Sequence, residues 1–534
     1  MIALTDCTPY HARQMNTEAD TIGENPANET EEDSLLSIAD ALRARCFATV
    51  STRHQKEFGQ FLTPPHVADL MAAMFDVRSA QVRLLDAGAG MGMLSAAFVR
   101  RQLQRKTPPK RIEVTAYELD SRLVQGIEQT YDACRFACQK RGVGFLATIR
   151  NTDFIAEAAE MQRRDLFSTT QPFFDAAIVN PPYGKLSAKS EGYRLLRAVS
   201  AETTNLYTAF LNLIIGLLHP KGELVAITPR SFCNGPYFKP FRQRFFKDMS
   251  LRRIHVFESR TAAFKHDNVL QENIVLRAVK DAKACRTIRV SQSGGGVEDA
   301  IRSRTFRAAE IVSPTDTETF IHIPTCKAHL AARAQIARLE GTLARLGLTV
   351  STGRVVDFRA RDHIRQQPET GTCPLIYPCH FNGLFVSWPA HRDRKPNAIR
   401  DNAQTQNLVV PAAVYVLTKR FTSKEERRRV VACIYDPNRI GAKQVGFENH
   451  LNYIHADGKG LDMLLAKGLW AYLNSSALDL YFRQFNGHTQ VNATDLRNVR
   501  FPTEPQLRAI GSHVGDMGME QDEVDRIVMK ETTA

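Results

Sequence analysis

The chain has 534 residues, of which 43% are hydrophobic and 24% are charged, as in an ordinary globular protein. A single core does not grow to this size, so we expect two or more domains. No apolar run approaches the roughly 20 residues that cross a bilayer, and the first residues lack the basic and then apolar segments of a secretion signal. These features predict a cytoplasmic protein without a membrane partner.

The charge is distributed unevenly along the chain. The net charge is +13, yet residues 1–34 hold eight acidic residues and one arginine, which leaves +20 on the remainder. A basic body predicts a polyanionic partner, although a merely basic, soluble surface is an alternative. Residues 1–34 are polar and aperiodic, which predicts a disordered acidic tail.

The ten cysteines lack the paired spacing of a zinc site. Cys134 and Cys138 lie four residues apart on an expected helix, with no second pair to complete a metal site. We therefore expect buried thiols and no metal, as in a reducing cytoplasm.

The predicted elements begin with an amphipathic helix near Ser34. From about residue 80 to 280, helical stretches alternate with short apolar strands, predicted at 82–86, 112–117, 145–149, 174–179, 223–228, 253–257 and 272–278. This rhythm predicts βαβ units and a mainly parallel, Rossmann-like sheet. Residues 327–346 are predicted as a helix, and short strands and turns follow, typical of an α+β domain.

A glycine-rich loop follows the first strand, over Asp86-Ala87-Gly88-Ala89-Gly90. Glycines there let the backbone approach a ligand closely at the mouth of a doubly wound sheet, and a nicotinamide site would also fit this pattern. Glu118 ends the second strand, where a carboxylate can hold both ribose hydroxyls of a nucleoside. Asp153 and Phe154 follow the third strand, where they could bind and cover an adenine.

The fourth strand runs into Asn180-Pro181-Pro182-Tyr183. The exocyclic amine of adenine is a poor nucleophile, because its lone pair is delocalised into the ring. The Asn180 side-chain oxygen and the Pro181 carbonyl could each accept one N–H of that amine, and Tyr183 could stack on the ring. The two prolines stiffen the loop and remove backbone donors. A plain proline-rich turn is the alternative.

Together these motifs resemble the class I S-adenosylmethionine-dependent methyltransferases, and more narrowly the γ-class DNA adenine-N6 methyltransferases of type II restriction–modification systems. Residues 59–65, Gly-Gln-Phe-Leu-Thr-Pro-Pro, precede the glycine-rich loop, which is the γ-class order. The resemblance implies an α/β catalytic domain that binds S-adenosyl-L-methionine through Phe61, Thr63, Asp86, Ala87, Gly88, Gly90, Glu118, Asp153, Phe154, Asn180 and Phe210.

The C-terminal half resembles the target-recognition region of the PstI-type modification methylases, with a TaqI-like two-domain architecture. The matching stretches are 350–359, 419–428, 448–453 and 487–492. The resemblance implies a tail at 1–34, a catalytic domain at 35–312, an α+β target-recognition domain at 313–505 and a C-terminal tail at 506–534.

Residues 341–505 carry 22 Lys and Arg against 14 Asp and Glu, which suits a DNA partner. Asn, Gln, His and Arg side chains that could contact bases are common there. The candidate DNA contacts are Lys185, Phe264, Arg354, Arg359, His450, Asn452, His488, Gln490 and Asn492. Phe264 stands where the family carries an aromatic that stacks on the flipped adenine. Residues 184–187 are expected to be mobile and cationic, and Arg427-Arg428-Arg429 is expected to be a solvated helix face or a phosphate contact.

The implied function is site-specific methyl transfer to N6 of a flipped-out adenine in double-stranded DNA, with Asn180, Pro181, Pro182 and Tyr183 as catalytic residues. Displacement at a sulfonium needs no metal, no catalytic histidine and no covalent intermediate. The partner expected from the resemblance is a separately encoded cognate restriction endonuclease, in a cytoplasm where the protein associates with the nucleoid. The alternatives are methyl transfer to RNA or to protein glutamine, and a catalytically silent DNA-reading module.

Overall fold

A computed structural model describes residues 31–49, 63–165, 173–258, 272–281, 283, 285–296, 299–390, 395–422, 426–487 and 489–533. The chain divides into two compact units between Thr325 and Cys326. The boundary expected at 312/313 comes earlier than this division, because residues 316–323 are bonded back to the first unit. Arg242 donates to the Glu318 carbonyl, with Nε 3.0 Å away, and the Ile321 amide donates to the Cys233 carbonyl at 3.0 Å.

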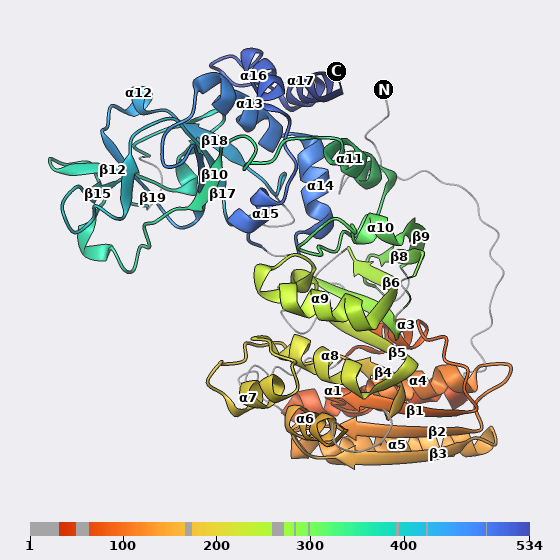
Figure 1. Ribbon diagram of the computed structural model, residues 1–534. Helices are drawn as coiled ribbons and strands as arrows, with labels where there is room; N and C mark the ends of the chain where they lie inside the picture. The colour runs from red at the N-terminus through yellow and green to blue at the C-terminus, as the bar shows by residue number, and fades with distance from the viewer. Residues whose placement is uncertain are drawn as a thin grey trace. The chain divides into compact units, whose positions relative to one another are not determined.

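The first unit contains a nine-stranded sheet in the order β3-β2-β1-β4-β5-β7-β6-β8-β9 (Figure 1). The strands are β1 (Gln81–Ala87), β2 (Arg111–Tyr117), β3 (Gly144–Arg150), β4 (Phe174–Val179), β5 (Leu218–Pro229), β6 (Met249–Phe257), β7 (Asn273–Lys280), β8 (Thr287–Ser293) and β9 (Arg302–Arg307). Neighbours from β3 to β5 are parallel, and β7 is antiparallel to β5 and β6. The mainly parallel α/β sheet is therefore confirmed, as are the seven predicted strands. Strands β8 and β9 were not predicted.

Helices lie on both sides of this sheet (Figure 1). One layer comprises α1 (Glu31–Thr49), α3 (Pro65–Ala72), α4 (Met93–Leu103) and α5 (Ser121–Lys140). The other comprises α6 (Phe154–Asp165), α8 (Leu206–Leu217) and α9 (Lys239–Asp248), with α7 (Glu191–Ala198) against α6. The first helix begins at Glu31 and so includes the last four residues of the expected acidic tail; the rest of that tail lies outside the described residues. Because both faces are covered, the central strands are apolar on both sides.

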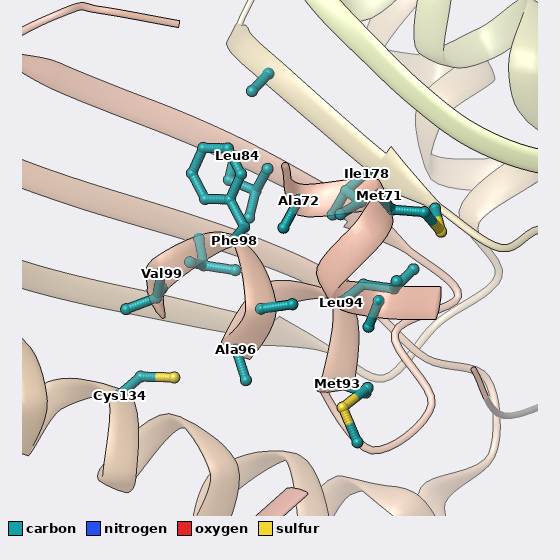
Figure 2. Close-up of a cluster of buried hydrophobic side chains, with 14 of the residues drawn as sticks. Met71, Ala72, Leu84, Met93, Leu94, Ala96, Phe98, Val99, Cys134 and Ile178 are labelled. Carbon is teal, nitrogen blue, oxygen red and sulfur yellow. The ribbon is translucent and has the colours of Figure 1, made fainter. Parts of the chain in front are cut away.

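The core between the sheet and the first helix layer is built from alternate strand residues. Leu84 of β1 and Ile178 of β4 pack against Leu94 and Phe98 of α4 (Figure 2). Cys134 and Cys138 are buried free thiols, and Cys134 belongs to the same cluster, as predicted. Burial raises the pKa of Cys138 to about 12. These thiols therefore serve packing.

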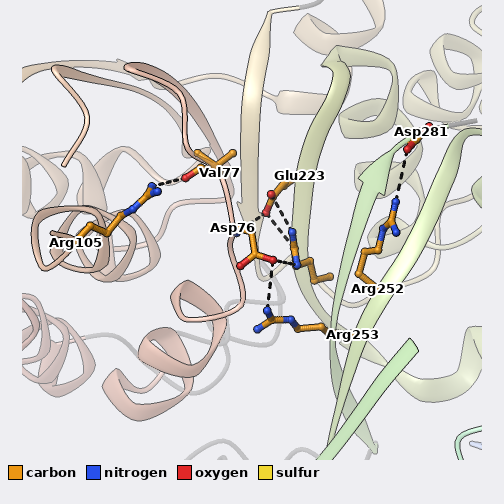
Figure 3. A network of polar contacts seen from close by, with 8 residues as sticks. Asp76, Val77, Arg105, Glu223, Arg252, Arg253 and Asp281 are labelled. Atoms are coloured by element: carbon orange, nitrogen blue, oxygen red, sulfur yellow. Dashed lines mark hydrogen bonds and ion pairs between the residues drawn. The ribbon is translucent and has the colours of Figure 1, made fainter. Parts of the chain in front are cut away.

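An ion-pair network centred on the buried Arg277 and Glu223 fastens the segment after α3 to the sheet (Figure 3). Arg277 of β7 donates to both carboxylate oxygens of Glu223 of β5, each at 3.0 Å, and its Nη1 lies 2.5 Å from Asp76. The Asp76 amide donates to Glu223 at 3.0 Å. Arg253 of β6 reaches Asp76 from a more exposed position, at 3.4 Å. This network fixes Asp76, and with it the C-terminal end of the segment from Thr63 to Asp76, to the sheet.

The remaining elements of the first unit are short. They are η1 (Arg230–Cys233), η2 (Pro236–Phe238) and α10 (Ala308–Ile311).

The second unit is built on two sheets. A six-stranded sheet has the order β10-β20-β17-β18-β14-β13, and a five-stranded sheet has the order β11-β15-β12-β19-β16. The strands are β10 (Thr349–Thr352), β11 (Ile364–Arg365), β12 (Thr372–Ile376), β13 (Phe381–Asn382), β14 (Phe385–Val386), β15 (Ala398–Arg400), β16 (Val409–Pro411), β17 (Tyr415–Lys419), β18 (Ala432–Tyr435), β19 (Gln444–Phe447) and β20 (Leu451–His455). The predicted change to short strands and turns is confirmed.

Helices flank these sheets, and two of them occupy the expected C-terminal tail. The helices are α11 (Lys327–Ala337), η3 (Arg361–His363), η4 (Pro378–His380), α12 (Pro437–Ile440), α13 (Met463–Leu473), α14 (Ser476–Phe485), α15 (Ala493–Arg497), α16 (Glu504–Ser512) and α17 (Gln521–Thr533). The helix predicted at 327–346 ends at Ala337. Residues 506–534 were expected to be a tail, but α16 and α17 bury Leu507, Ile510 and Val524.

Helices α13 and α16 approach each other closely at two glycines. A Cβ on Gly468 would lie 1.9 Å from the Leu507 carbonyl oxygen, and one on Gly511 would lie 1.9 Å from that of Leu464. The helix backbones therefore touch where only hydrogen atoms fit. In the part of the chain that the structure describes, no helix is long and apolar enough to cross a membrane.

Candidate active site

The strand order reverses between β1 and β4. From β1 the chain adds β2 and β3 on one side, and β4 and β5 follow on the other side. In open α/β sheets, ligands bind in the crevice outside the carboxyl ends of the strands at such a point. The glycine-rich loop leaves β1 there, and Asn180 leaves β4 there, because Asp86 is in register with Ile178. The two motifs singled out from the sequence thus lie next to each other.

The glycine-rich loop is shaped by left-handed residues. Gly88 and Gly90 have φ values of +81° and +57°, which side chains rarely adopt. A Cβ on Gly88 would lie 3.9 Å from both the Asn180 carbonyl oxygen and the Phe210 ring. The Gly88 and Ala89 amides donate to the Tyr117 carbonyl at 2.8 and 2.9 Å. The loop is therefore fixed to β2, close to Asn180 and Phe210.

Asp86 lies fully buried beneath this loop. The Ser95 hydroxyl of α4 donates to its Oδ2 at 2.6 Å, and the Tyr131 hydroxyl of α5 donates to Ser95 at 3.1 Å. Its Oδ1 is buried without a hydrogen-bond partner among the described groups. Burial raises the pKa of Asp86 to about 7, against the lowering effect of the Ser95 hydrogen bonds. The site therefore contains a carboxyl group with one oxygen available to a donor or cation.

Glu118 supports the glycine-rich loop from the end of β2. Its Oε2 accepts from the Gly90 amide at 2.8 Å, and its Oε1 accepts from the Asp120 amide at 2.9 Å. Burial raises the pKa of this carboxyl group. Each carboxylate oxygen can accept a further hydrogen bond, so Glu118 can bind a ligand while it holds the loop.

Aromatic rings form one wall of the site. The Phe154 ring lies 5.0 Å from that of Phe210 and 5.1 Å from that of Tyr117. Phe154 and Phe210 are largely buried. Asp153, by contrast, is exposed, and its Oδ1 accepts from the Ile155 amide at 2.8 Å. This bond in the first turn of α6 gives Asp153 a helix-capping role as well.

Asn180 is held between Thr63 and Tyr183. Its Nδ2 donates to the Thr63 hydroxyl at 3.1 Å, and the Tyr183 hydroxyl lies 3.4 Å from its Oδ1. The Tyr183 ring meets Tyr207 edge to face at 6.4 Å, and burial raises the pKa of both phenols. Thr63 is buried and precedes α3. The hydrogen bond from Nδ2 to Thr63 orients the Asn180 carboxamide, and Oδ1 is its acceptor atom.

Residues 184–187 are not the mobile loop that the sequence suggested. The Leu186 amide donates to the Thr204 carbonyl at 2.7 Å, and the Leu206 amide donates to the Gly184 carbonyl at 3.0 Å. These two bonds form a short antiparallel bridge between Lys185 and Asn205. The Lys185 side chain is exposed on this bridge, so its charge has a fixed backbone position.

In the second unit, backbone hydrogen bonds join the four stretches selected from the sequence to one another. The Asn449 amide donates to the Val355 carbonyl at 2.8 Å, and the Arg420 amide donates to the His450 carbonyl at 2.8 Å. The Val491 amide donates to the Arg420 carbonyl at 2.7 Å. We call residues 353–355, 419–422, 448–450 and 489–491 the four-segment face.

Several polar candidates in this unit have structural roles instead. Asn452 is fully buried and donates to the Val491 carbonyl at 2.9 Å. Asn492 is the N-cap of α15 and is bonded reciprocally with Asp495. Arg429 was expected to be solvated or to contact phosphate, but only 2% of it is exposed, and it donates to the Thr422 carbonyl and to Asn486. Their hydrogen-bonding capacity is used within the fold.

The other candidates remain at the surface. Arg354 and Arg359 are exposed and Gln490 is half-buried. The guanidinium of Arg359 lies 5.5 Å from the Phe358 ring centre. Phe61, Phe264 and His488 lie outside the described residues. Within those residues, no group of three or more His, Cys, Asp or Glu side chains could hold a metal ion.

Sequence reasoning missed three residues that shape the site. Ser95 and Tyr131 hold Asp86, and Tyr207 holds Tyr183. Ser95 stands on the buried face of an amphipathic helix directly after the glycine-rich loop, which is a signal that could have been used. Tyr131 and Tyr207 resemble ordinary core aromatics in the sequence.

Comparison with known proteins finds restriction–modification methylases. Residues 116–264, which include Asn180–Tyr183, match the family model described as Eco57I restriction-modification methylase. The chain is 42% identical over 497 residues to the type II methyltransferase M.PstI of Providencia stuartii, covering 93% of this chain and 97% of the relative. It is 40% identical over 465 residues to the type II methyltransferase M.BsuBI of Bacillus subtilis, covering 86% and 91%.

Among solved structures, the type IIG restriction endonuclease BpuSI aligns with 94% of this chain and 67% of its own at 12% identity, with a TM-score of 0.44. The assignment rests on the sequence relatives, which match over nearly their whole length. The chain belongs to the type II methyltransferases of restriction–modification systems, the family of M.PstI and M.BsuBI.

Proposed function

We propose that this methyltransferase transfers a methyl group from S-adenosyl-L-methionine to N6 of an adenine in double-stranded DNA. The observation that carries the proposal is the placement of Asn180. Its side chain is fixed by Thr63 at the carboxyl end of β4, and its backbone carbonyl faces Gly88 of the glycine-rich loop. The group that would hold the acceptor amine and the loop that would hold the cofactor are thus neighbours.

The hydrogen bonding of Asn180 suits an amine acceptor. Nδ2 donates to Thr63, and Oδ1, which accepts from the Tyr183 hydroxyl at 3.4 Å, can use its second lone pair to accept an N–H of the substrate. The Pro181 carbonyl provides a second acceptor on a backbone that two prolines restrain. Accepting both hydrogens localises the nitrogen lone pair and orients it, which is catalysis by positioning and electrostatics.

The residues at the β1–β4 crevice fit the proposed cofactor. A bound S-adenosylmethionine supplies an electrophilic methyl group on a positively charged sulfur. Asp86 has a buried oxygen without a partner, Glu118 can accept hydroxyl donors, and Phe154 and Phe210 provide an apolar wall for a purine. A side chain at position 88 would occupy the space between the loop, the Asn180 carbonyl oxygen and the Phe210 ring. Glycine leaves that space to a ligand. No part of this proposal requires a metal ion.

An adenine within a duplex is paired and stacked, so its amine must leave the helix to reach Asn180. Extrusion costs a few kcal/mol. We propose that Tyr183, with Phe264, recovers part of this cost by stacking on the base. We assign sequence recognition to the second unit, through the four-segment face, where Arg354 and Gln490 carry donors and acceptors suited to base edges.

The biological role that we propose is protection of host DNA in the cytoplasm from a separately encoded restriction endonuclease. Family membership supports this role, since the relatives are type II methyltransferases.

The test uses the purified full chain and S-adenosylmethionine with an isotopically labelled methyl group. Genomic DNA from a host without adenine methylation, total RNA and total protein are incubated separately. Nucleoside digests of the DNA should contain labelled 6-methyladenine, and sequencing of the modified DNA gives the recognition site. Label in RNA or in protein glutamine, with none in DNA, would replace this proposal by one of the two alternatives.

A further inference from the structure

Phe421 is an exposed aromatic residue at the centre of the four-segment face. The residue is 40% exposed, and its backbone forms an isolated bridge with Gln490. The residues on either side are bonded to the neighbouring segments: the Arg420 amide to the His450 carbonyl, and the Thr422 amide to the Thr489 carbonyl at 3.0 Å. A large apolar side chain is therefore displayed on a fixed backbone.

The ring is supported from one side. The His450 ring lies 4.7 Å from it, tilted by 48°. His450 is itself held by the buried Glu448, which accepts from its Nδ1 and from its amide. The Arg420 guanidinium lies 5.7 Å from the Phe421 ring centre, with Nη1 donating to the Asn449 carbonyl at 3.1 Å. These contacts restrict the ring and leave part of it in solvent.

The base of this arrangement is the buried Arg429. The Thr422 hydroxyl donates to the Arg429 carbonyl at 2.7 Å, and Arg429 donates to the Thr422 carbonyl and to Asn486. Asn486 in turn donates to the Gln490 carbonyl at 3.0 Å. The two segments that meet at Phe421 and Gln490 are thus also joined through Arg429 and Asn486. Rigid support of this kind suits a side chain that must keep its position when it contacts a binding partner.

The chemistry around the ring identifies its partner. The four-segment face carries three cationic residues, Arg354, Lys419 and Arg420, and one carboxylate, Glu448, which is buried against His450. An apolar partner surface would leave these cations unpaired, whereas a nucleic acid offers phosphates to the cations and base faces to the ring. Architectural DNA-binding proteins insert apolar side chains between base steps in this way.

We propose that Phe421 is an aromatic wedge that stacks on bases of the duplex at the recognition site and thereby lowers the cost of extruding the target adenine. This inference rests on the proposed function, and it adds a positioning residue that sequence motifs did not single out. His450 and Arg420 hold the ring, and the basic side chains of the same face bind the backbone of the DNA.

The experiment compares two synthetic duplexes that carry the site found by sequencing the methylated genomic DNA. One is fully paired, and in the other the target adenine faces a mismatched base, which makes extrusion less costly. Phe421→Ala should lower kcat/KM on the paired duplex by roughly ten- to hundred-fold, the loss of one stacked base. On the mismatched duplex it should stay within about threefold of wild type, because little stacking assistance is needed there.

Phe421→Tyr, which keeps the aromatic face, should resemble wild type on both duplexes. Phe136→Ala is the matched control: Phe136 is an exposed phenylalanine of α5 with Lys140 4.5 Å from its ring centre, and its loss should change neither rate. Phe421→Leu keeps the apolar volume without the aromatic face, and it replaces the alanine variant in the test if the latter does not fold.

Equal losses on the paired and mismatched duplexes, or no loss on the paired duplex, would overturn the inference. Failure of the proposed function is a separate and earlier result, since genomic DNA would then contain no labelled 6-methyladenine and no site could be found; it would remove the basis of this inference as well.

Discussion

In the first unit, polar side chains that sequence motifs single out lie at the carboxyl ends of β1, β2 and β4, with hydrogen-bonding capacity left for a ligand. In the second unit, many of the polar side chains selected by residue type are consumed inside the fold, as Asn452, Asn492 and Arg429 are. The difference has a physical cause. A parallel sheet satisfies its own backbone through regular ladders, whereas short strands and long turns need side chains to satisfy theirs.

The comparison can be tested first through stability, where the expected effect is largest. Arg277→Met leaves Glu223 buried without its cation, which should cost about 3–5 kcal/mol of unfolding free energy. Both tryptophans, Trp388 and Trp470, lie in the second unit, so the loss should appear in circular dichroism but not in tryptophan fluorescence. Arg253→Met, which removes a more exposed contact to Asp76, is the control and should cost less than about 1 kcal/mol.

Catalysis provides the next test of the first unit. Asn180→Ala removes the acceptor that Thr63 orients, and should reduce kcat by roughly 100- to 1,000-fold, as for loss of one positioned hydrogen-bonding group. Cofactor affinity, measured by calorimetry, should remain near that of wild type, because the Asn180 backbone carbonyl is retained. Tyr183→Phe removes only the hydroxyl at 3.4 Å and should have a much smaller effect. Loss of binding with normal turnover would contradict the assigned role.

Arg429 tests whether the second unit uses its arginines structurally. Arg429→Met removes a buried guanidinium that bonds to Thr422 and Asn486, and should lower the stability of that unit by about 2–3 kcal/mol. Urea unfolding followed by tryptophan fluorescence measures this directly. The exposed Arg427 is two residues away, and Arg427→Met should change stability by less than about 0.5 kcal/mol. Equal stability of both variants would remove the contrast between the two units.

The smallest effect concerns Asp86 and depends on pH. Its raised pKa of about 7 means that the free protein holds this carboxyl group protonated below neutrality. A cationic cofactor favours the ionised form, so affinity for S-adenosylmethionine should rise as the pH increases through 7. Asp86→Asn should bind about tenfold more weakly at pH 8 and show no such rise, as calorimetry at several pH values would reveal.

The same titration affects the stability of the free protein in the opposite direction. Because the folded pKa of Asp86 lies above the unfolded value of about 3.9, its contribution to stability is complete below pH 4 and is lost as the pH rises through 7. Asp86→Asn should remove this dependence from the thermal unfolding profile.

Much of the first unit could be predicted from the sequence, because regular alternation of strands and helices fixes the element types and motifs mark the strand ends. The early starts of β5 at Leu218 and β6 at Met249 could not be seen, since neither begins with an uninterrupted apolar run. Strand β9 is largely exposed on an edge and lacks an apolar signal. The pairing of Thr63 with Asn180 depends on a contact across 117 positions of the chain, which no local pattern encodes.

The second unit was less predictable for a related reason. The stretches around Gly353, Arg420, His450 and Gln490 lie together in the fold, but which of their side chains face solvent depends on backbone pairing between distant segments. Phe421 was passed over because an exposed aromatic and a core aromatic look alike in a sequence. The helices α16 and α17 were read as a tail, although their apolar residues recur with helical spacing.

The contact of α13 with α16 has a practical consequence. At Gly468 and Gly511 even a methyl group meets a backbone carbonyl of the other helix, so alanine at either position must push the two helices apart. The resulting gap weakens the packing of these two helices, whereas Asp86, Glu118 and Asn180 belong to the other unit and are unchanged. Such a substitution offers a route to a heat-labile enzyme, with which methylation could be switched off in growing cells by a mild temperature shift.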